Sequence, residues 1–313
     1  MSASGPPEGP YRGRFAPSPT GPLHFGSLVA AMASYADARR NAGAWLVRIE
    51  DVDVPRARPR AADDILHALE GYGFEWEGPV WRQSSRRDAY EAALARLAAA
   101  GLAYACVCTR QALAAQPIGR IGERVYPGTC RDGIGHHGDR AAERTRRAAV
   151  RVRVPSARIA FTDRLHGLQQ QRLDEDVGDF VVRRSDGLCA YQLAVVVDDA
   201  AQRITDVVRG ADLLASTPRQ IFLQRALGVA TPRYLHVPVA VDARGAKLSK
   251  QTAATPLPAA PLPALHAAWR FLGQCAPSDP ACPVSEFWTW AIAHWDAGRI
   301  PAAATRPAPT AIV

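Results

Sequence analysis

Lysine is almost missing from this chain of 313 residues. Only Lys247 and Lys250 are lysines among its 38 basic residues, and all the others are arginines. Lysine carries a compact ammonium on a flexible stem, whereas arginine is a planar fork. The two are therefore not interchangeable where a charge must follow a moving phosphate. The lysine pair follows the turn residues Asp242 and Gly245. This pattern is compatible with a loop that folds over a polyphosphate, or with two surface lysines of no special role.

Two other kinds of segment are also lacking. No apolar run approaches the roughly 18 residues that a membrane span needs. The stretch from Met1 to Gly13 is polar and rich in proline and glycine, without the apolar centre of a secretory signal. We therefore expect a cytoplasmic protein that does not associate with membranes.

Disulfides are not expected from the six cysteines, because cytoplasmic thiols stay reduced. Three of them, Cys106, Cys108 and Cys130, form a Cys-x-Cys…Cys cluster, which indicates either a metal site or reduced free thiols. Zinc would require a fourth ligand, and His136 and His137 are close enough in sequence to supply it. Such a site would be structural and would stabilise the loop-rich segment around it.

The segment from Arg14 to Ser27 combines a loop with the start of a helix. Regular structure is excluded in its first part by Pro17, Pro19, Gly21 and Pro22. A helix is predicted from Leu28 to Arg40, followed by a strand from Trp45 to Glu50. This places His24 and Gly26 at a helix N-terminus, where free backbone N–H groups and the positive end of the helix dipole bind phosphate.

These two regions together resemble the two signature motifs of the glutamyl subgroup of class I aminoacyl-tRNA synthetases. The first signature is matched from Pro17 to Gly26, and the second from Lys247 to Lys250. Further segments resemble the same subgroup in the same order, namely 48–53, 191–199, 208–214 and 216–220. The resemblance covers roughly residues 12 to 251.

This resemblance implies an α/β fold, a Rossmann-like doubly wound parallel sheet. We expect the catalytic domain at 12–104 and 186–255, with the lysine loop in its second half. A zinc-binding insertion that contacts tRNA would separate the two halves at 105–185, and a short helical region with a disordered tail would follow at 256–313. The resemblance also implies that Tyr126 completes the zinc site of the three cysteines.

Local patterns predict further elements. A capping-box sequence at 84–88 predicts a helix that begins there and runs to Ala100. Other helices are expected at 63–70, after Thr217, at 264–272 and at 287–295. The Ala- and Pro-rich end is expected to be disordered.

The implied reaction joins a carboxylate to the α-phosphate of ATP and expels pyrophosphate, so the site must stabilise negative charge on phosphate oxygens. His24 would donate to the α-phosphate, and Gly26 would let the nucleotide approach the backbone. Lys247, Ser249 and Lys250 would neutralise the departing pyrophosphate. Mg²⁺ is expected to accompany ATP, held mainly by phosphate oxygens and water.

Glutamate carries one ammonium and two carboxylates, so its pocket should offer an acid and an arginine. The resemblance implies that Glu50 binds the α-ammonium, and we assign Arg209 to the side-chain carboxylate. The implied glutamate site comprises Arg14, Phe15, Ala16, Pro17, Ser18, Glu50, Tyr191 and Arg209.

The acceptor is expected to be a tRNA. The net charge of +8, the pI near 9.5 and the arginine-dense run at 140–153 favour an acidic partner. The residues after Lys250 are too few for a helical anticodon-binding region, and in this respect the chain resembles the branch of the family that attaches glutamate to queuosine in tRNA(Asp). We expect it to act as a monomer. The alternatives are a truncated enzyme that charges a tRNA 3′ end and a tRNA-binding paralog without catalysis.

Overall fold

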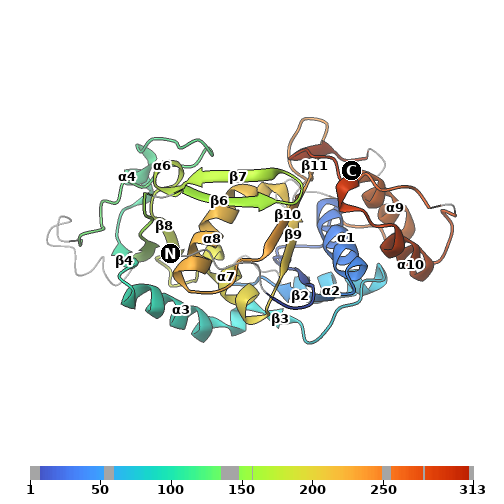
Figure 1. Cartoon of the computed structure of the whole chain (residues 1–313), viewed down its shortest axis with the longest axis horizontal. Coiled ribbons are helices and arrows are strands. Elements are labelled where there is room, and N and C mark those ends of the chain that lie inside the picture. Colours follow the sequence, from blue (N-terminus) through green and yellow to red (C-terminus); the bar gives the residue numbers. More distant parts are fainter. Residues whose placement is uncertain are drawn as a thin grey trace.

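The computed structural model describes residues 8–52, 60–134, 148–156, 158–248, 255–277 and 279–309. The molecule is elongated (Figure 1). At one end, helices of the C-terminal region lie against α1 (Phe25–Arg40). At the other end lie α3 (Arg87–Ala99), α4 (Arg110–Ala114), β4 (Ala103–Cys106) and β8 (Phe180–Arg183). Among the described residues, no helix has the length and apolar character needed to cross a membrane.

Parallel strands form the centre of the fold. β1 (Arg12–Phe15), β2 (Ala44–Ile49) and β3 (Trp81–Arg82) make one sheet in the order β1-β2-β3. A second sheet consists of β6 (Arg158–Asp163), β7 (Gly167–Arg172), β9 (Asp206–Gly210) and β10 (Arg233–Val237). Its order is β7-β6-β10-β9, and β9 and β10 are parallel. The Thr205 N–H donates to the Arg12 carbonyl and the Arg12 N–H donates to the Thr205 hydroxyl, which joins β1 to the residue before β9. The predicted α/β class with parallel sheets is confirmed, and the strands' carboxyl ends converge where ligands bind in such folds.

The segment expected as an insertion contributes to two sheets. β4 (Ala103–Cys106), β5 (Ala149–Val152) and β8 (Phe180–Arg183) form a separate antiparallel sheet. The hairpin of β6 (Arg158–Asp163) and β7 (Gly167–Arg172) instead extends the sheet of β9 and β10, because β6 pairs in parallel with β10. This hairpin is therefore part of the framework around the strand ends.

Helices cover these sheets. The longest is α1 (Phe25–Arg40), and the others are α2 (Ala61–Gly71), α3 (Arg87–Ala99), α4 (Arg110–Ala114), α6 (Leu173–Asp176), α7 (Tyr191–Ala201), α8 (Thr217–Ala226), α9 (Pro261–Phe271) and α10 (Val284–His294). Short 3-10 turns occupy Gln83–Ser85, Ala211–Ser216 (η4) and Ala297–Arg299. The expected helices at 63–70, after Thr217, at 264–272 and at 287–295 are thus present, with ends shifted by a few residues.

Helix α1 is buried on nearly every side, which fixes the position of its N-terminus. Its Tyr35 ring makes edge contacts with Trp45 and Trp288 at centroid distances of 5.1 and 4.8 Å. Its Asp37 carboxylate accepts hydrogen bonds from Tyr11 at 2.5 Å and from Trp295 at 3.0 Å. The C-terminal helices therefore hold α1 against the sheet.

Two local expectations are wrong. The helix predicted from residue 84 begins at Arg87, since the Ser84 hydroxyl donates to Asp51 at 2.8 Å instead of capping a helix. The tail is partly ordered, because β12 (Thr305–Pro307) pairs in parallel with β11 (Val239–Val241). Residues 310–313 lie outside the described residues.

Candidate active site

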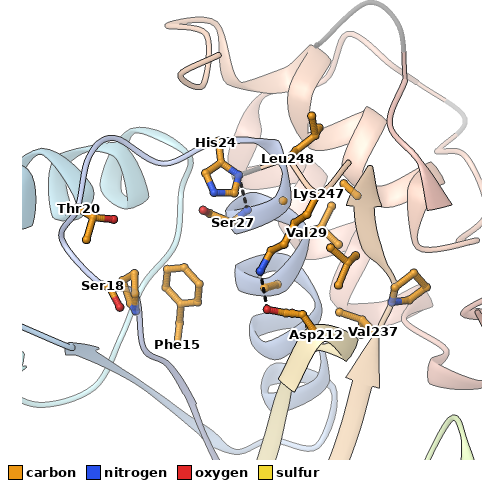
Figure 2. A pocket seen from close by; sticks show the side chains of 17 residues that line it. Phe15, Ser18, Thr20, His24, Ser27, Val29, Asp212, Val237, Lys247 and Leu248 are labelled. Atoms are coloured by element: carbon orange, nitrogen blue, oxygen red, sulfur yellow. Dashed lines mark hydrogen bonds and ion pairs between the residues drawn. The ribbon is translucent and has the colours of Figure 1, made fainter. Parts of the chain in front are cut away.

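The first signature segment and the start of the lysine loop line one cavity of about 480 Å³. Figure 2 shows His24 and Ser27 at the N-terminus of α1, with Lys247 reaching toward Asp212 across the cavity. The cavity is completed by Phe15, Pro17, Ser18, Thr20, Gly26, Val29, Ala30, Gly210, Val237, Pro238, Val239, Ala240 and Leu248.

His24 caps α1, which explains why the helix begins three residues before the predicted start. Its Nδ1 atom accepts the backbone N–H of Ser27 at 3.3 Å. A neutral imidazole that accepts at Nδ1 carries its proton on Nε2. The half-buried ring can therefore present an N–H donor at a helix N-terminus, where the helix dipole also favours an anion.

Gly26 lies tightly beside this ring. A Cβ atom at this position would come within 3.2 Å of His24 Cε1 and within 3.5 Å of the Leu248 carbonyl oxygen. Any side chain would push against the histidine and narrow the cavity. Glycine here leaves the His24 ring in place, whereas a side chain would require the ring to move by a few tenths of an ångström.

The lysine loop is anchored on both sides of its central residues. Lys247 Nζ lies 2.5 Å from Asp212 Oδ2, and the Leu248 N–H donates to the Ala240 carbonyl at 3.0 Å. After the loop, Pro256 forms a bridge with His24. The candidate residues Ser249 and Lys250 lie outside the described residues, but both flanks of their segment contact the cavity wall.

A second cavity of about 320 Å³ adjoins the first and shares Phe15, Ser18, Ala30 and Gly210 with it. It is lined by most of the residues expected to bind glutamate, namely Arg14, Phe15, Ala16, Ser18, Glu50, Tyr191 and Arg209. Pro17 lines the first cavity instead, and its carbonyl oxygen accepts the Glu50 N–H at 2.9 Å. The buried Phe15 ring also stacks against Trp45.

Glu50 is held in a buried network of charges. Arg48 lies 3.2 Å from Glu50 and 2.8 Å from Asp199, while Arg14 lies 3.2 Å from Asp199. Burial raises the pKa of Glu50, although the charges of Arg48 and Arg14 oppose the increase. Burial acts in the same direction on Asp199, but Arg14 and Arg48 outweigh it and lower the pKa. A cation bound beside Glu50 would further favour its ionised form.

Sequence reasoning missed Arg48 and Asp199 as site residues. Both lie inside the segments that carried the family resemblance, at 48–53 and 191–199, but nothing in their spacing indicates that they meet. Arg48 lies on β2 and Asp199 lies on α7, and the two form a buried ion pair. The sequence does not show that these two elements pack together.

Arg209 is oriented by three neutral partners. Its Nε donates to His236 Nε2 at 3.0 Å, and its Nη2 donates to Thr217 at 2.9 Å and to Gln220 at 2.8 Å. Its buried Nη1 has no hydrogen-bond partner among the described residues, and no described carboxylate pairs with the guanidinium. This arrangement leaves a charge and a donor for an acidic ligand.

His236 is itself fixed by an acid. Its Nδ1 lies 2.6 Å from Asp163 Oδ2, so Nδ1 donates to the carboxylate and Nε2 is left to accept from Arg209. Burial lowers the pKa of His236 to about 4, and the Arg209 charge acts in the same direction. The ring is therefore neutral at physiological pH. Sequence reasoning did not single out either residue.

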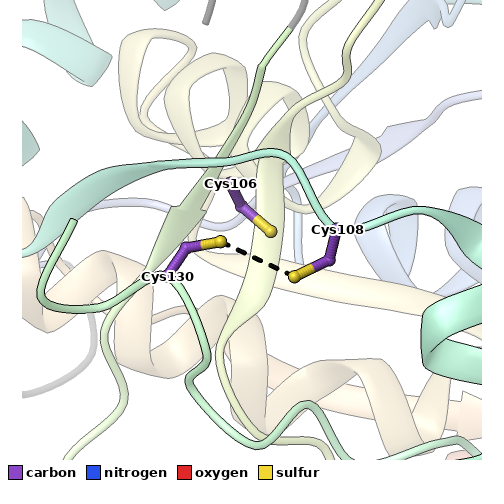
Figure 3. Close-up of side chains that lie close together, drawn as sticks. All are labelled: Cys106, Cys108 and Cys130. Carbon is purple, nitrogen blue, oxygen red and sulfur yellow. Dashed lines mark hydrogen bonds between the residues drawn. The ribbon is translucent and has the colours of Figure 1, made fainter. Parts of the chain in front are cut away.

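The three cysteines of the predicted metal site come together (Figure 3). Their sulfur atoms all lie within 4.8 Å of one another, and Cys108 and Cys130 are 3.6 Å apart. All three thiols are free of disulfides. Burial by itself raises the pKa of Cys106, but hydrogen bonding with Tyr126 and with the Cys108 backbone and the nearby Arg151 charge outweigh it and lower the pKa.

The Tyr126 hydroxyl points into the same cluster. It lies 3.3 Å from Cys106 Sγ and 3.6 Å from Cys108 Sγ, and it accepts the Cys130 N–H at 3.0 Å. Three cysteine sulfur atoms this close together are donors that suit a four-coordinate zinc ion, and the Tyr126 hydroxyl lies where a fourth ligand would be. The residues thus fit a structural zinc ion, and the competing His136 and His137 lie outside the described residues.

Comparison with known proteins identifies the class of this fold and site. Residues 11–257 match the family described as tRNA synthetases class I (E and Q), catalytic domain. A glutamate-tRNA synthetase structure from Elizabethkingia anophelis superposes with a TM-score of 0.78 at 25% identity, covering 97% of this chain and 69% of that one. A glutamate tRNA ligase from Elizabethkingia meningosepticum in complex with its amino acid gives 0.75 at 25% identity, covering 97% and 68%. The protein is a ligase of the class I synthetase type.

Curated relatives narrow the identification. Proteins named glutamyl-Q tRNA(Asp) synthetase are similar over nearly their whole length. The relative from Aromatoleum aromaticum is 55% identical over 96% of this chain and 94% of its own, and that from Dechloromonas aromatica is 57% identical over 93% and 96%. The relative from Pseudomonas aeruginosa PAO1 is 54% identical over 95% and 97%. The chain belongs to the glutamyl-Q tRNA(Asp) synthetase family, which confirms the predicted resemblance.

Proposed function

We propose that this protein activates L-glutamate with ATP to glutamyl-adenylate without needing tRNA, and then transfers the glutamate to queuosine at the wobble position of tRNA(Asp). The observation that carries the proposal is the pair of adjoining cavities. One presents a histidine donor at a helix N-terminus together with a lysine of the facing loop, and the other presents an acid and an arginine without an acidic partner among the described residues. Reactants bound in them would meet at the wall that the cavities share.

The first cavity would hold ATP. When the glutamate α-carboxylate attacks the α-phosphate, an oxygen–phosphorus bond forms and the bond to pyrophosphate breaks. Nε2–H of His24 would donate to an α-phosphate oxygen as its charge grows. Lys247, with Ser249 and Lys250 on the same loop, would neutralise the pyrophosphate that leaves. Mg²⁺ would enter with ATP and offset phosphate charge.

The second cavity would orient glutamate. Glu50 would accept from the α-ammonium, and Arg209 would donate to the side-chain carboxylate through Nη1. Tyr191 is the first residue of α7 and lines the same cavity as Glu50 and Arg209. Burial raises the pKa of its hydroxyl, so Tyr191 stays a neutral hydrogen-bonding group. Such a pocket would reject glutamine, whose amide carries no charge to pair with the guanidinium.

The transfer step would attach the activated carboxyl group to a hydroxyl of the queuosine cyclopentene-diol. This hydroxyl would attack the adenylate carbonyl, form an ester and release AMP. The names of the relatives support this acceptor. The protein's net charge of +8 supports a nucleic-acid partner bound largely through its phosphates. Such a reaction would take place in the cytoplasm.

Zinc would be held by Cys106, Cys108, Tyr126 and Cys130. Its role there would be structural, because a four-coordinate site leaves no open position for a substrate. The site would fix the chain after β4 against the loop of Cys130, beside the antiparallel sheet.

The test is a transfer reaction with labelled glutamate, ATP and bulk tRNA from cells with or without queuosine, followed by nuclease digestion. We expect label only in the queuosine-bearing anticodon fragment. Label at a tRNA 3′ end regardless of queuosine would instead establish a truncated glutamyl-tRNA synthetase. Absence of glutamate-dependent ATP–pyrophosphate exchange would establish a paralog without catalysis.

A further inference from the structure

A third cavity, of about 380 Å³, lies on the other side of the active-site wall. It is enclosed by the β6–β7 hairpin, by the N-terminal part of α8 with η4, and by a short stretch around Ile121. Figure 1 shows the hairpin lying alongside α8. The lining consists of Arg120, Ile121, Phe161, Gln169, Gln170, Gln171, Asp176, Ala211, Leu214, Ala215 and Pro218.

The turn η4 separates this cavity from the two already described. Asp212 lines the first cavity, Leu213 the second, and Ala211 and Leu214 the third. Consecutive residues of one short turn therefore face three neighbouring spaces. A ligand in the third cavity would lie immediately behind the wall of the glutamate pocket.

Gln171 is the unusual residue of this cavity. It is only 7% exposed, yet neither its amide nitrogen nor its amide oxygen has a hydrogen-bond partner among the described residues. Buried amides are normally paired because an unpaired one costs stability. A donor and an acceptor held side by side in a cavity wall indicate a ligand that presents the complementary pair.

The remaining lining fits a flat ring. Pairing of Ile159 with Gln171 and of Phe161 with Gln169 puts the Phe161 ring on the same face of the hairpin as the Gln171 amide. Leu214, Ala215, Pro218 and Ile121 add apolar surface. The cavity also contains the amides of Gln169 and Gln170, but these have hydrogen-bond partners, unlike that of Gln171. An aromatic and apolar wall beside an unpaired amide is a feature by which proteins bind an unpaired nucleobase.

The cavity also has a positively charged neighbour. Arg158 is exposed at the start of β6, where Nη1 donates to Gln170 at 2.8 Å, and no described carboxylate pairs with it. Arg158 and Gln171 both line an adjacent polar space. Arg158 lies on the opposite face of the hairpin from Phe161, so it would contact the phosphate of a nucleotide in the third cavity through this adjacent space, which Gln170 and Gln171 also line.

We propose that the third cavity binds an unpaired nucleobase of the tRNA loop, next to the nucleotide that receives glutamate, and that the Gln171 amide pairs with the edge of this base. The inference rests on the proposed function, which brings a tRNA loop to the neighbouring pocket. It adds a base-specific contact that is separate from glutamate activation.

The test uses Gln171→Met, which keeps the length of the side chain and removes the amide. Glutamate-dependent ATP–pyrophosphate exchange should stay at the wild-type level, and the melting temperature should stay equal or rise, because an unpaired buried amide is lost. The Kd for the anticodon stem-loop of queuosine-containing tRNA(Asp), and the KM for transfer to it, should rise about tenfold. Gln111→Met, on the exposed face of α4, is the matched control and should behave like the wild type.

The outcomes separate this inference from the proposed function. If the wild type binds and glutamylates the stem-loop and Gln171→Met does so equally well, the base-binding role is wrong while the proposed function stands. If the wild type neither binds nor glutamylates the stem-loop, both are wrong. A Gln171→Met variant that also loses exchange would mean that the residue acts on the active site, and it would overturn a separate base pocket.

Discussion

Nδ1 of His236 lies 2.6 Å from Oδ2 of Asp163, 73 residues earlier in the chain. Because the carboxylate takes the proton-bearing side of the ring, the opposite nitrogen must accept from Arg209. Asp163 thus controls, through one imidazole, the direction in which a guanidinium faces the glutamate pocket. His236 is a positioning residue in this arrangement, since it does not line either active-site cavity.

Substitutions of His236 should separate its two hydrogen bonds. The amide of His236→Gln can place an oxygen at the position of Nε2, where it accepts from Arg209. The shorter amide of His236→Asn reaches only the position of Nδ1, so it can keep the contact with Asp163 but not the one with Arg209. We expect His236→Asn to raise the KM for glutamate about tenfold or more in ATP–pyrophosphate exchange, with a smaller change in kcat, and His236→Gln to retain more of the wild-type KM. Equal defects in kcat and KM for both variants would indicate a purely structural role. The exposed His294→Gln is the control.

The same histidine predicts a pH dependence of stability. Its pKa of about 4 in the folded protein lies below the ordinary value of 6.5, so the unfolded chain takes up the proton first. Its contribution to the free energy of unfolding is complete above about pH 6.5 and decreases as the pH falls toward 4. Neighbouring Asp163 acts in the same direction at lower pH, since its own pKa is lowered by the His236 hydrogen bond despite burial.

Urea unfolding at pH 7 and pH 5 measures this effect. The wild type should lose more stability between the two values than His236→Gln does, whatever their difference at pH 7. Parallel losses in the two proteins would contradict the assignment of a low pKa to His236. His294→Gln should follow the wild type.

The two lysines should act on activation but not on glutamate binding. Lys250→Ala should abolish ATP–pyrophosphate exchange, and Lys247→Ala should lower its rate by roughly 10²–10³, because each would lose a cation that the proposed mechanism assigns to the departing pyrophosphate. Glutamate affinity, measured by calorimetry without ATP, should change less than about twofold. An equal loss of glutamate binding would disprove the role given to this loop. Arg40→Lys, at the exposed end of α1, is the control for a change of basic residue.

Removal of the Tyr126 hydroxyl should weaken zinc retention. Tyr126→Phe keeps the ring under Arg151 but removes the oxygen that contacts two sulfur atoms. The wild type should contain one zinc ion per chain, and the variant should lose it faster to a chelator and melt at a lower temperature. The exposed Cys275→Ser should retain zinc. A wild-type protein without zinc after purification in its presence would contradict the proposed site.

The sequence predicted the parts of the site that belong to continuous motifs. His24 and Gly26 at a helix N-terminus, and the cysteine cluster, follow from local patterns that survive folding. The charge network of Arg14, Arg48 and Asp199 could not be predicted, because its members meet only when two strands and a helix from different halves of the chain pack together. The roles of Ser249 and Lys250, and the monomeric state, stay predictions.

The local errors have the same origin. Serine is a common helix-capping residue, but the Ser84 hydroxyl donates instead to the carboxylate of Asp51, which follows β2. The alanine- and proline-rich tail lacks the composition of a strand, yet β12 in this tail forms a parallel pair with β11. In each case a tertiary partner overrides a local preference.

The pairing of β12 with β11 joins the C-terminal tail to the strand that precedes the lysine loop. β11 leads directly into this loop, and the Ala308 N–H donates to the Val241 carbonyl at 2.8 Å. Val239 and Ala240 of β11 line the first cavity, whereas β12 does not. A substitution that disturbs β12 would therefore act on the wall of the first cavity from outside it.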